Sequence, residues 1–135
     1  MGEIVDLASL AAAVPVIERK IADIDISQFV PGGVIKMQDL SIAQLTNAAA
    51  DAQKIRIKRP DWPQQLCMQV ALMAQAHVEP KGNLAPALFY MQVAETNTGM
   101  FGYLLVAFNE AFPHINNIEA AADEAEADFF PPALV

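Results

Sequence analysis

The chain has one thiol and two imidazoles, and a Cys–His pair is the first arrangement here that could perform covalent catalysis. In such a pair the imidazole must lie within hydrogen-bond reach of the sulfur to remove its proton. Cys67 and His77 are ten residues apart in one predicted helix, a separation that turns the helix through about 1000° and advances it by about 15 Å. The two side chains therefore point in different directions, and we expect Cys67 to be an inert core thiol.

Histidines and carboxylates could also bind a metal ion or transfer protons. His77, Glu79 and His114 would form a metal site only if the tertiary fold brought them together, and a histidine on an apolar helix face is more often a packing residue. Asp23 and Asp25 point to the same side of a predicted strand, and a solvated strand face explains them without acid–base chemistry. We therefore expect no catalytic residue, no metal site and no enzyme.

Signals for phosphate binding are weak as well. Gly32-Gly33 lacks the third glycine and the strand-to-helix context of a dinucleotide-binding loop, and no Gly-Lys-Ser/Thr sequence occurs. The basic run from Lys54 to Arg59 alternates with isoleucine and could lay one charged face on RNA or DNA. However, the formal net charge of −8 repels phosphate backbones. We expect this run to be a basic connection, solvated or paired with acidic residues of the C-terminal segment, and we expect neither a cofactor nor a nucleic-acid partner.

The composition is that of a globular protein. The 135 residues are 54% hydrophobic and 18% charged, and a chain of this length buries roughly two-thirds of its unfolded surface without needing disulfides or metal. The first residues lack the positive region of a signal peptide. The most apolar stretch, Met100 to Phe108, is about half as long as a membrane-spanning helix. We expect synthesis in the cytoplasm and no membrane partner.

The N-terminal part is predicted to contain a β-hairpin near residues 22–37. Apolar and acidic residues alternate from Ala22 to Ile26, as in a half-buried strand. Val30-Pro31-Gly32-Gly33 fits a type II turn, so the chain should return as a strand over residues 34–37. An alanine-rich stretch over residues 2–14 predicts a short helix before the hairpin.

Ser41 and Gln44 have the S-x-x-Q form of a capping box and predict the start of an amphipathic helix. We expect this helix to end near Gln53, because the basic run and Pro60 follow it. Four residues are predicted to form its buried stripe: Ile42, Leu45, Ala49 and Ala52.

Three further helices are predicted. Asp61 is a suitable N-cap with Gln64 three residues later, so a helix should run from Trp62 to about Val78. Pro86 fits the first turn of a helix reaching about Glu95, and a nearly all-apolar helix should extend over residues 100–112.

Six residues are candidates for contacts with other proteins. Met68 and Leu72 project nearly opposite the other apolar residues of their helix, and the helix that contains Phe101 has almost no polar face. The last three lie at the C-terminus, after a strongly acidic stretch: Phe129, Phe130 and Leu134. So much apolar surface predicts a homo-oligomer.

These patterns predict a mainly α fold of the α+β type, with four to five helices and a small N-terminal β-hairpin. We expect one domain over residues 1–118. Residues 119–135 are expected to form a mobile acidic segment with an apolar end, because half of residues 119–128 are acidic and most of the others are alanine.

The order of these elements resembles a known family. The strand Gly33-Val34-Ile35-Lys36-Met37 followed by Leu40-Ser41-Ile42-Ala43-Gln44-Leu45 resembles the strand and capped helix of the small tail assembly chaperones of long-tailed bacteriophages. The aliphatic sequence from Met68 to Val78 and the hydrophilic loop from Glu79 to Asn83 resemble the helix and loop that follow in that family. The resemblance covers about residues 30–128.

The resemblance implies a non-enzymatic protein that binds the tape measure protein, keeps it soluble and recruits tail tube protein during tail assembly. Such a protein acts in the cytoplasm of the bacterial host, forms oligomers and is absent from the finished particle. Two other functions remain open on the sequence alone. One is a small structural head-tail joining or tail-completion protein, and the other is an acidic regulator that binds a basic protein.

Overall fold

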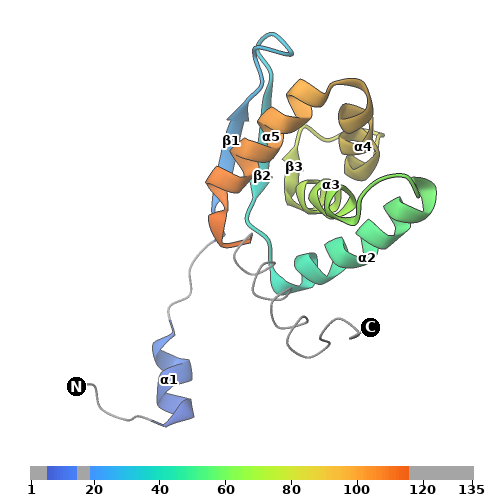
Figure 1. Ribbon diagram of the computed structural model, residues 1–135. Coiled ribbons are helices and arrows are strands. Elements are labelled where there is room, and N and C mark those ends of the chain that lie inside the picture. The colour runs from blue at the N-terminus through green and yellow to red at the C-terminus, as the bar shows by residue number, and fades with distance from the viewer. Residues whose placement is uncertain (1–5, 15–18, 116–135) are drawn as a thin grey trace, which may run out of the picture.

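The computed structural model describes residues 6–14 and 19–115. In this part of the chain a small antiparallel sheet and a group of helices pack together, while one short helix stands apart near the N-terminus (Figure 1). The elements in chain order are α1 (Leu7–Ala13), β1 (Ile21–Asp25), β2 (Val34–Gln38), α2 (Ile42–Lys58), α3 (Gln64–Ala76), β3 (His77–Glu79), α4 (Pro86–Thr96) and α5 (Thr98–Ala111). The mainly helical α+β fold with an N-terminal hairpin is therefore confirmed.

The hairpin of β1 and β2 forms as its turn residues predict. Pro31 and Gly32 occupy the two central turn positions, and Gly32 has a φ of 72°, which glycine adopts without steric cost. The Gly33 N–H donates to the Val30 carbonyl oxygen at 2.8 Å and closes the turn. A Cβ at Gly33 would lie 2.9 Å from both the Val30 carbonyl oxygen and the Ile26 side chain, so this position also has no room for a larger residue.

A third strand, β3, completes the sheet in the order β1-β2-β3. The sequence predicted that the helix containing Cys67 would continue to Val78, but α3 ends at Ala76 and His77 already has extended backbone dihedrals. The chain then pairs with β2, where Lys36 faces Glu79 and Met37 faces His77. Pairing with a distant strand decides this boundary, and such pairing leaves no local sequence signal.

The capping box of α2 is confirmed: the Gln44 N–H donates to Ser41 Oγ at 3.2 Å and the Ser41 N–H to Gln44 Oε1 at 3.0 Å. The predicted end near Gln53 and the basic connection after it are wrong, because α2 continues to Lys58. Pro60 disfavours helical dihedrals in Arg59 but not in the residues before Arg59, and the burial of Ile55 holds the last turns against the core. Basic side chains in the last turn also interact favourably with the helix dipole.

The buried stripe of α2 is shifted from the predicted one. Ile42 and Ala49 are exposed, and the buried residues of the helix are Ala48, Ala52 and Ile55. These positions lie on one face, together with the half-buried Leu45. The extra five residues, about one and a half turns, allow Ile55 to contribute to this face.

The predicted N-cap of the next helix is also wrong. Helix α3 begins at Gln64 with Pro63 as the N-cap, and no side chain caps it. Pro63 disfavours helical dihedrals in Trp62, so the residues before it form a turn in which the Trp62 N–H donates to the Arg59 carbonyl oxygen at 3.0 Å. Asp61 therefore lies outside the helix.

Helix α3 is the centre of the molecule. It packs against α2, α4, α5 and β2, and in Figure 1 it lies between α2 and α4. Its buried residues are Cys67, Val70, Ala71, Leu72, Met73 and Ala76. The two apolar faces that the sequence predicted for this helix are therefore covered by other elements of the same chain.

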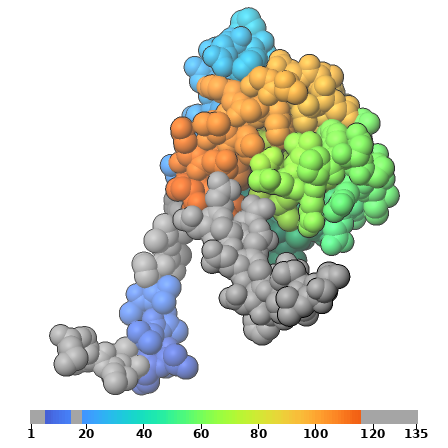
Figure 2. Space-filling model, in the orientation of Figure 1, coloured from blue at the N-terminus to red at the C-terminus, as the bar shows by residue number. Residues whose placement is uncertain are grey.

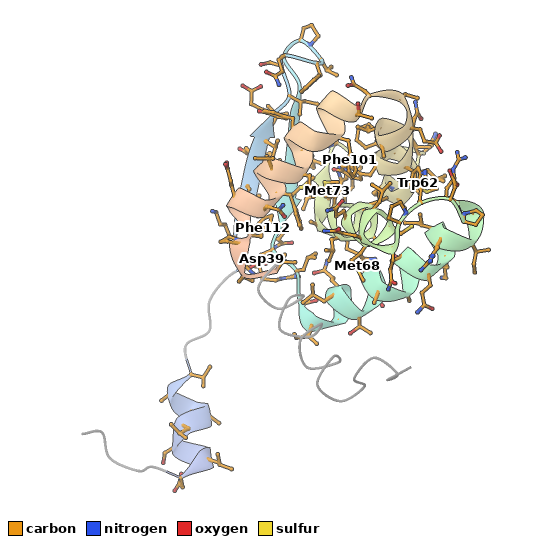
Figure 3. The ribbon with its side chains drawn as sticks, viewed as in Figure 1. Asp39, Trp62, Met68, Met73, Phe101 and Phe112 are labelled. Carbon is orange, nitrogen blue, oxygen red and sulfur yellow. The ribbon has the colours of Figure 1, made fainter. Side chains whose placement is uncertain are left out.

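The last two helices close the core. In α4 Pro86 occupies the first turn as predicted. Helix α5 begins at Thr98, and its N-cap is Asn97, whose side chain accepts the Met100 N–H at 3.0 Å. Helix α5 lies across the sheet and contacts β1 (Figure 1). Buried side chains from Ile24 to Ile115 form one cluster, in which Met73 and Phe101 lie in the interior (Figure 3).

Helix α1 contributes no buried residue to this cluster, and Figure 2 shows it projecting from the rest of the described chain. The predicted acidic segment 119–135 lies outside the described residues. Within residues 6–14 and 19–115, no helix is long and apolar enough to cross a membrane.

Candidate functional site

The most distinctive polar contact in the described chain joins β3 to α4. His77 Nδ1 lies 2.8 Å from the Tyr90 hydroxyl, and His77 Nε2 lies 2.6 Å from the Pro80 carbonyl oxygen. A carbonyl oxygen only accepts, so Nε2 carries the proton and donates to Pro80. In the neutral imidazole Nδ1 is then the acceptor, and the Tyr90 hydroxyl donates to it.

Tyr90 is fully buried, and this burial raises the pKa of its phenol far above the usual range. The hydroxyl therefore remains a proton donor at neutral pH and holds the His77 ring in one tautomer. Phe89 lies edge-on to Tyr90, with ring centroids 5.0 Å apart. The His77–Tyr90 pair thus ties β3 to α4 beside a surface feature that His77 lines.

That surface feature is an apolar groove of about 450 Å³ between β3, the following loop and the start of α4. Its apolar lining consists of Ile35, Val78, Pro80, Leu84, Pro86 and Phe89. Its polar lining is limited to His77, Lys81 and the backbone near Gly82. We call this concave surface, with its apolar and polar lining, the loop groove. A concave apolar surface with few polar groups suits apolar or aromatic side chains of a ligand.

A second hollow of about 450 Å³ adjoins the loop groove and shares Pro80 and Lys81 with it. It is lined by the hairpin residues Gly32, Val34 and Lys36, and by Glu79. Lys36 lies 3.9 Å from Asp23 in an exposed, weak ion pair. Lys81 forms no ion pair with any residue in the described ranges. The shared edge therefore carries the positive charge of Lys81, with Glu79 on the side of the second hollow.

The residues singled out for catalysis do not come together. Cys67 is fully buried, and burial raises the pKa of its thiol, which favours the unreactive protonated form. His77 lies beyond the end of α3 and bonds to Tyr90 and Pro80 instead. The structure thus places Cys67 in the core, as expected from the sequence.

The second histidine forms a separate surface contact. His114 Nε2 lies 2.8 Å from an Asp39 carboxylate oxygen, and the same oxygen accepts the Leu40 N–H at 2.8 Å. This pair ties the end of α5 to the end of β2. Among the residues that the structure describes, no three histidine, cysteine, aspartate or glutamate side chains are grouped so as to hold a metal ion.

Asp23 and Asp25 lie on the exposed face of the sheet, as predicted for a solvated strand face. The Ser27 backbone N–H donates to the Asp25 carboxylate at 2.8 Å and lowers the pKa of that carboxyl group. Neither carboxylate lies in an enclosed site, so the two do not form an acid–base pair of the catalytic type.

The basic run is the exposed C-terminal part of α2. Lys54, Arg56 and Lys58 are exposed, and Arg59 pairs with Glu95 of α4 and lies over the Trp62 ring. Arg59 therefore ties the two helices together.

The six predicted contact residues are placed differently from one another. Met68 is half-buried and lies between α3 and α2 (Figure 3). Leu72 and Phe101 are only 5% and 8% exposed, so neither side chain is accessible to a partner in this conformation. Phe129, Phe130 and Leu134 lie outside the described residues.

The sequence patterns do not predict the loop groove. Leu84 falls between the predicted loop and the predicted helix, and Phe89 falls within that helix, whereas in the structure both residues lie in the groove lining and Leu84 is 51% exposed. An apolar residue between two prolines in an otherwise polar loop was the available signal.

Comparisons of the chain with protein-family models, with curated proteins and with solved structures found no match.

Proposed function

We propose that this protein is a phage tail assembly chaperone, a non-enzymatic protein that holds apolar segments of the tape measure protein and keeps that protein soluble. The loop groove is the observation that carries the proposal. It is open, mostly apolar and lined by an exposed leucine and a phenylalanine ring. A long helical client that is not yet enclosed by its tube exposes side chains of the complementary kind.

The arrangement of the elements supports the same proposal. The strand, the capped helix and the aliphatic helix on which the family resemblance rests are β2, α2 and α3. The loop that follows α3 and β3 forms one wall of the groove. Recruitment of tail tube protein and action in the cytoplasm of the bacterial host belong to the same proposal, as does assembly into a homo-oligomer.

Co-expression with the tape measure protein of the same phage tests the proposal. The wild-type chain should increase the soluble fraction of that client, and Leu84→Asp should abolish the increase because it places a charge in the groove. Leu88→Asp is the matched control, since Leu88 is 44% exposed on α4 and does not line the groove. A client whose solubility does not change with the wild-type chain would contradict the proposal.

The second candidate is a structural head-tail joining or tail-completion protein. The small size of this chain and the single hydrophobic core of its described residues fit this function as well. Mass spectrometry of purified particles separates the two candidates, because a structural component is present in stoichiometric amounts and a chaperone is absent.

A further inference from the structure

The loop groove has an apolar floor and a cationic edge, and this combination restricts what can bind there. Leu84 and Val34 are 51% and 47% exposed, so each presents apolar surface to solvent. Lys81 lies at the edge that the two hollows share, and no carboxylate of the described residues forms an ion pair with it. A suitable peptide would have aromatic or proline residues for the groove and carboxylates for Lys81.

The C-terminal segment of this chain has that composition. Five of the ten residues from Glu119 to Asp128 are acidic, and they are followed directly by Phe129-Phe130-Pro131-Pro132-Ala133-Leu134-Val135. We propose that residues 129–135 occupy the loop groove of their own chain, with the preceding carboxylates facing Lys81. Two phenylalanines supply the apolar anchors, and the two prolines reduce the conformational entropy lost on docking.

The segment is long enough to reach the groove of the same chain. The described chain ends at Ile115. The residue before it, His114, contacts Asp39, which directly follows β2, so the C-terminal segment starts close to this end of the sheet. Ile35 in the groove lining is four residues from Asp39 along β2, a distance of about 14 Å, and β3 lies about 5 Å further across the sheet. Phe129 is 14 residues from Ile115, and such a length spans up to about 46 Å when extended.

Occupancy within one chain is favoured over occupancy between copies. A tethered segment meets its site at an effective concentration of order millimolar when the linker spans the distance. The same segment of a second copy that is free in solution is present only at the protein concentration, which is far lower in dilute solution.

Helix α1 is the rival occupant, because Leu7 and Leu10 are exposed and nothing in the described chain covers them. The chain that joins α1 to β1 ends in Arg19 and Lys20. These two side chains donate to Gln44 Oε1 and to the Ala111 carbonyl oxygen, so they stay at the start of α2 and the end of α5. Helix α1 has one carboxylate at its start, Asp6, which already accepts the Ser9 N–H. Five carboxylates lie within residues 119–128, so attraction to Lys81 favours the C-terminal segment.

This inference rests on the groove that the proposed function assigns to the client, and it gives the groove a regulator. The client would have to displace residues 129–135, so Phe129→Ala/Phe130→Ala should increase client binding. The test below uses the protein alone, so its outcome does not depend on whether the client has been identified correctly.

Paramagnetic relaxation in the full-length chain tests the proposal. A nitroxide is attached at Ala133→Cys in a Cys67→Ala background, and methyl signals of Leu84 and Val78 are recorded by NMR. We expect strong broadening of both signals. Phe129→Ala/Phe130→Ala should reduce the broadening of both signals to the level of distant methyl groups. Leu84→Asp, in which only the Val78 signal remains to be observed, should reduce the broadening of that signal in the same way. The Leu88→Asp control should leave the broadening unchanged.

Three results would overturn the proposal. One is the absence of broadening in the groove, and another is broadening confined to methyl groups elsewhere. The third is broadening between copies, measured in a mixture of one copy that carries the nitroxide and a second copy that carries the isotope label. If the nitroxide broadens the groove signals of the second copy, the occupant comes from a partner chain. A nitroxide at Ala8→Cys that broadens the groove signals when Ala133→Cys does not would assign the groove to α1.

Discussion

The hydrogen bond between His77 and Tyr90 allows the most direct test of the site geometry. In Tyr90→Phe the hydroxyl is removed and His77 Nδ1 loses its donor at 2.8 Å. In His77→Phe the fully buried Tyr90 hydroxyl loses its acceptor. A buried polar group left without a partner costs about 1–3 kcal/mol, so we expect each single change to lower the free energy of unfolding by about 1–2 kcal/mol.

The double variant Tyr90→Phe/His77→Phe removes both polar atoms, so no unsatisfied group remains between them. Its free energy of unfolding should therefore fall by less than the sum of the two single effects, with a coupling energy of about 1–2 kcal/mol. Urea denaturation monitored by circular dichroism gives the required values, provided that the slope of each unfolding curve is unchanged.

Tyr103→Phe is the matched control. The Tyr103 hydroxyl donates to the Asp25 carbonyl oxygen at an exposed position, where water can replace it. This change should cost well under 1 kcal/mol. Additive effects of Tyr90→Phe and His77→Phe, within about 0.3 kcal/mol, would refute the assigned hydrogen bond and with it the tautomer of His77.

Four further outcomes are expected. Leu72→Asp should lower the melting temperature strongly or prevent folding, because it buries a charge where the side chain is 5% exposed; a folded variant with altered oligomer size would support an exposed role for Leu72 instead. Cys67→Ala should leave oligomer size unchanged and cost about 1–2 kcal/mol, and the native thiol should react with a thiol reagent only after unfolding; rapid reaction of the native protein would contradict this. Burial raises the pKa of Tyr90 in the folded state, so above about pH 10 the unfolded state binds fewer protons than the folded state, and the free energy of unfolding should fall as pH rises further. Ultraviolet titration should show that Tyr90 ionises only as the protein unfolds. Ionisation of Tyr90 in the folded protein would contradict the assigned burial. Light scattering at tens of micromolar should report dimers or larger assemblies, and a monomer alone would contradict the predicted homo-oligomer.

The sequence by itself determined the elements that depend on local chemistry. The turn at Pro31-Gly32 requires a positive φ that glycine supplies, and the capping box of Ser41 and Gln44 satisfies backbone donors within four residues. Pro86 marks the start of α4 for a similarly local reason. Residues close in sequence carry these signals, so no knowledge of the tertiary fold was needed.

Tertiary structure decided the features that depend on distant partners. Helix α2 extends to Lys58 because the core covers Ile55, and β3 exists because β2 offers backbone groups to pair with. The same pairing takes His77 out of the helix and places it between Tyr90 and Pro80, and the loop groove is built around it. Neither the pairing nor the resulting groove has a periodic signal in the sequence, because contacts between residues far apart in the chain create both.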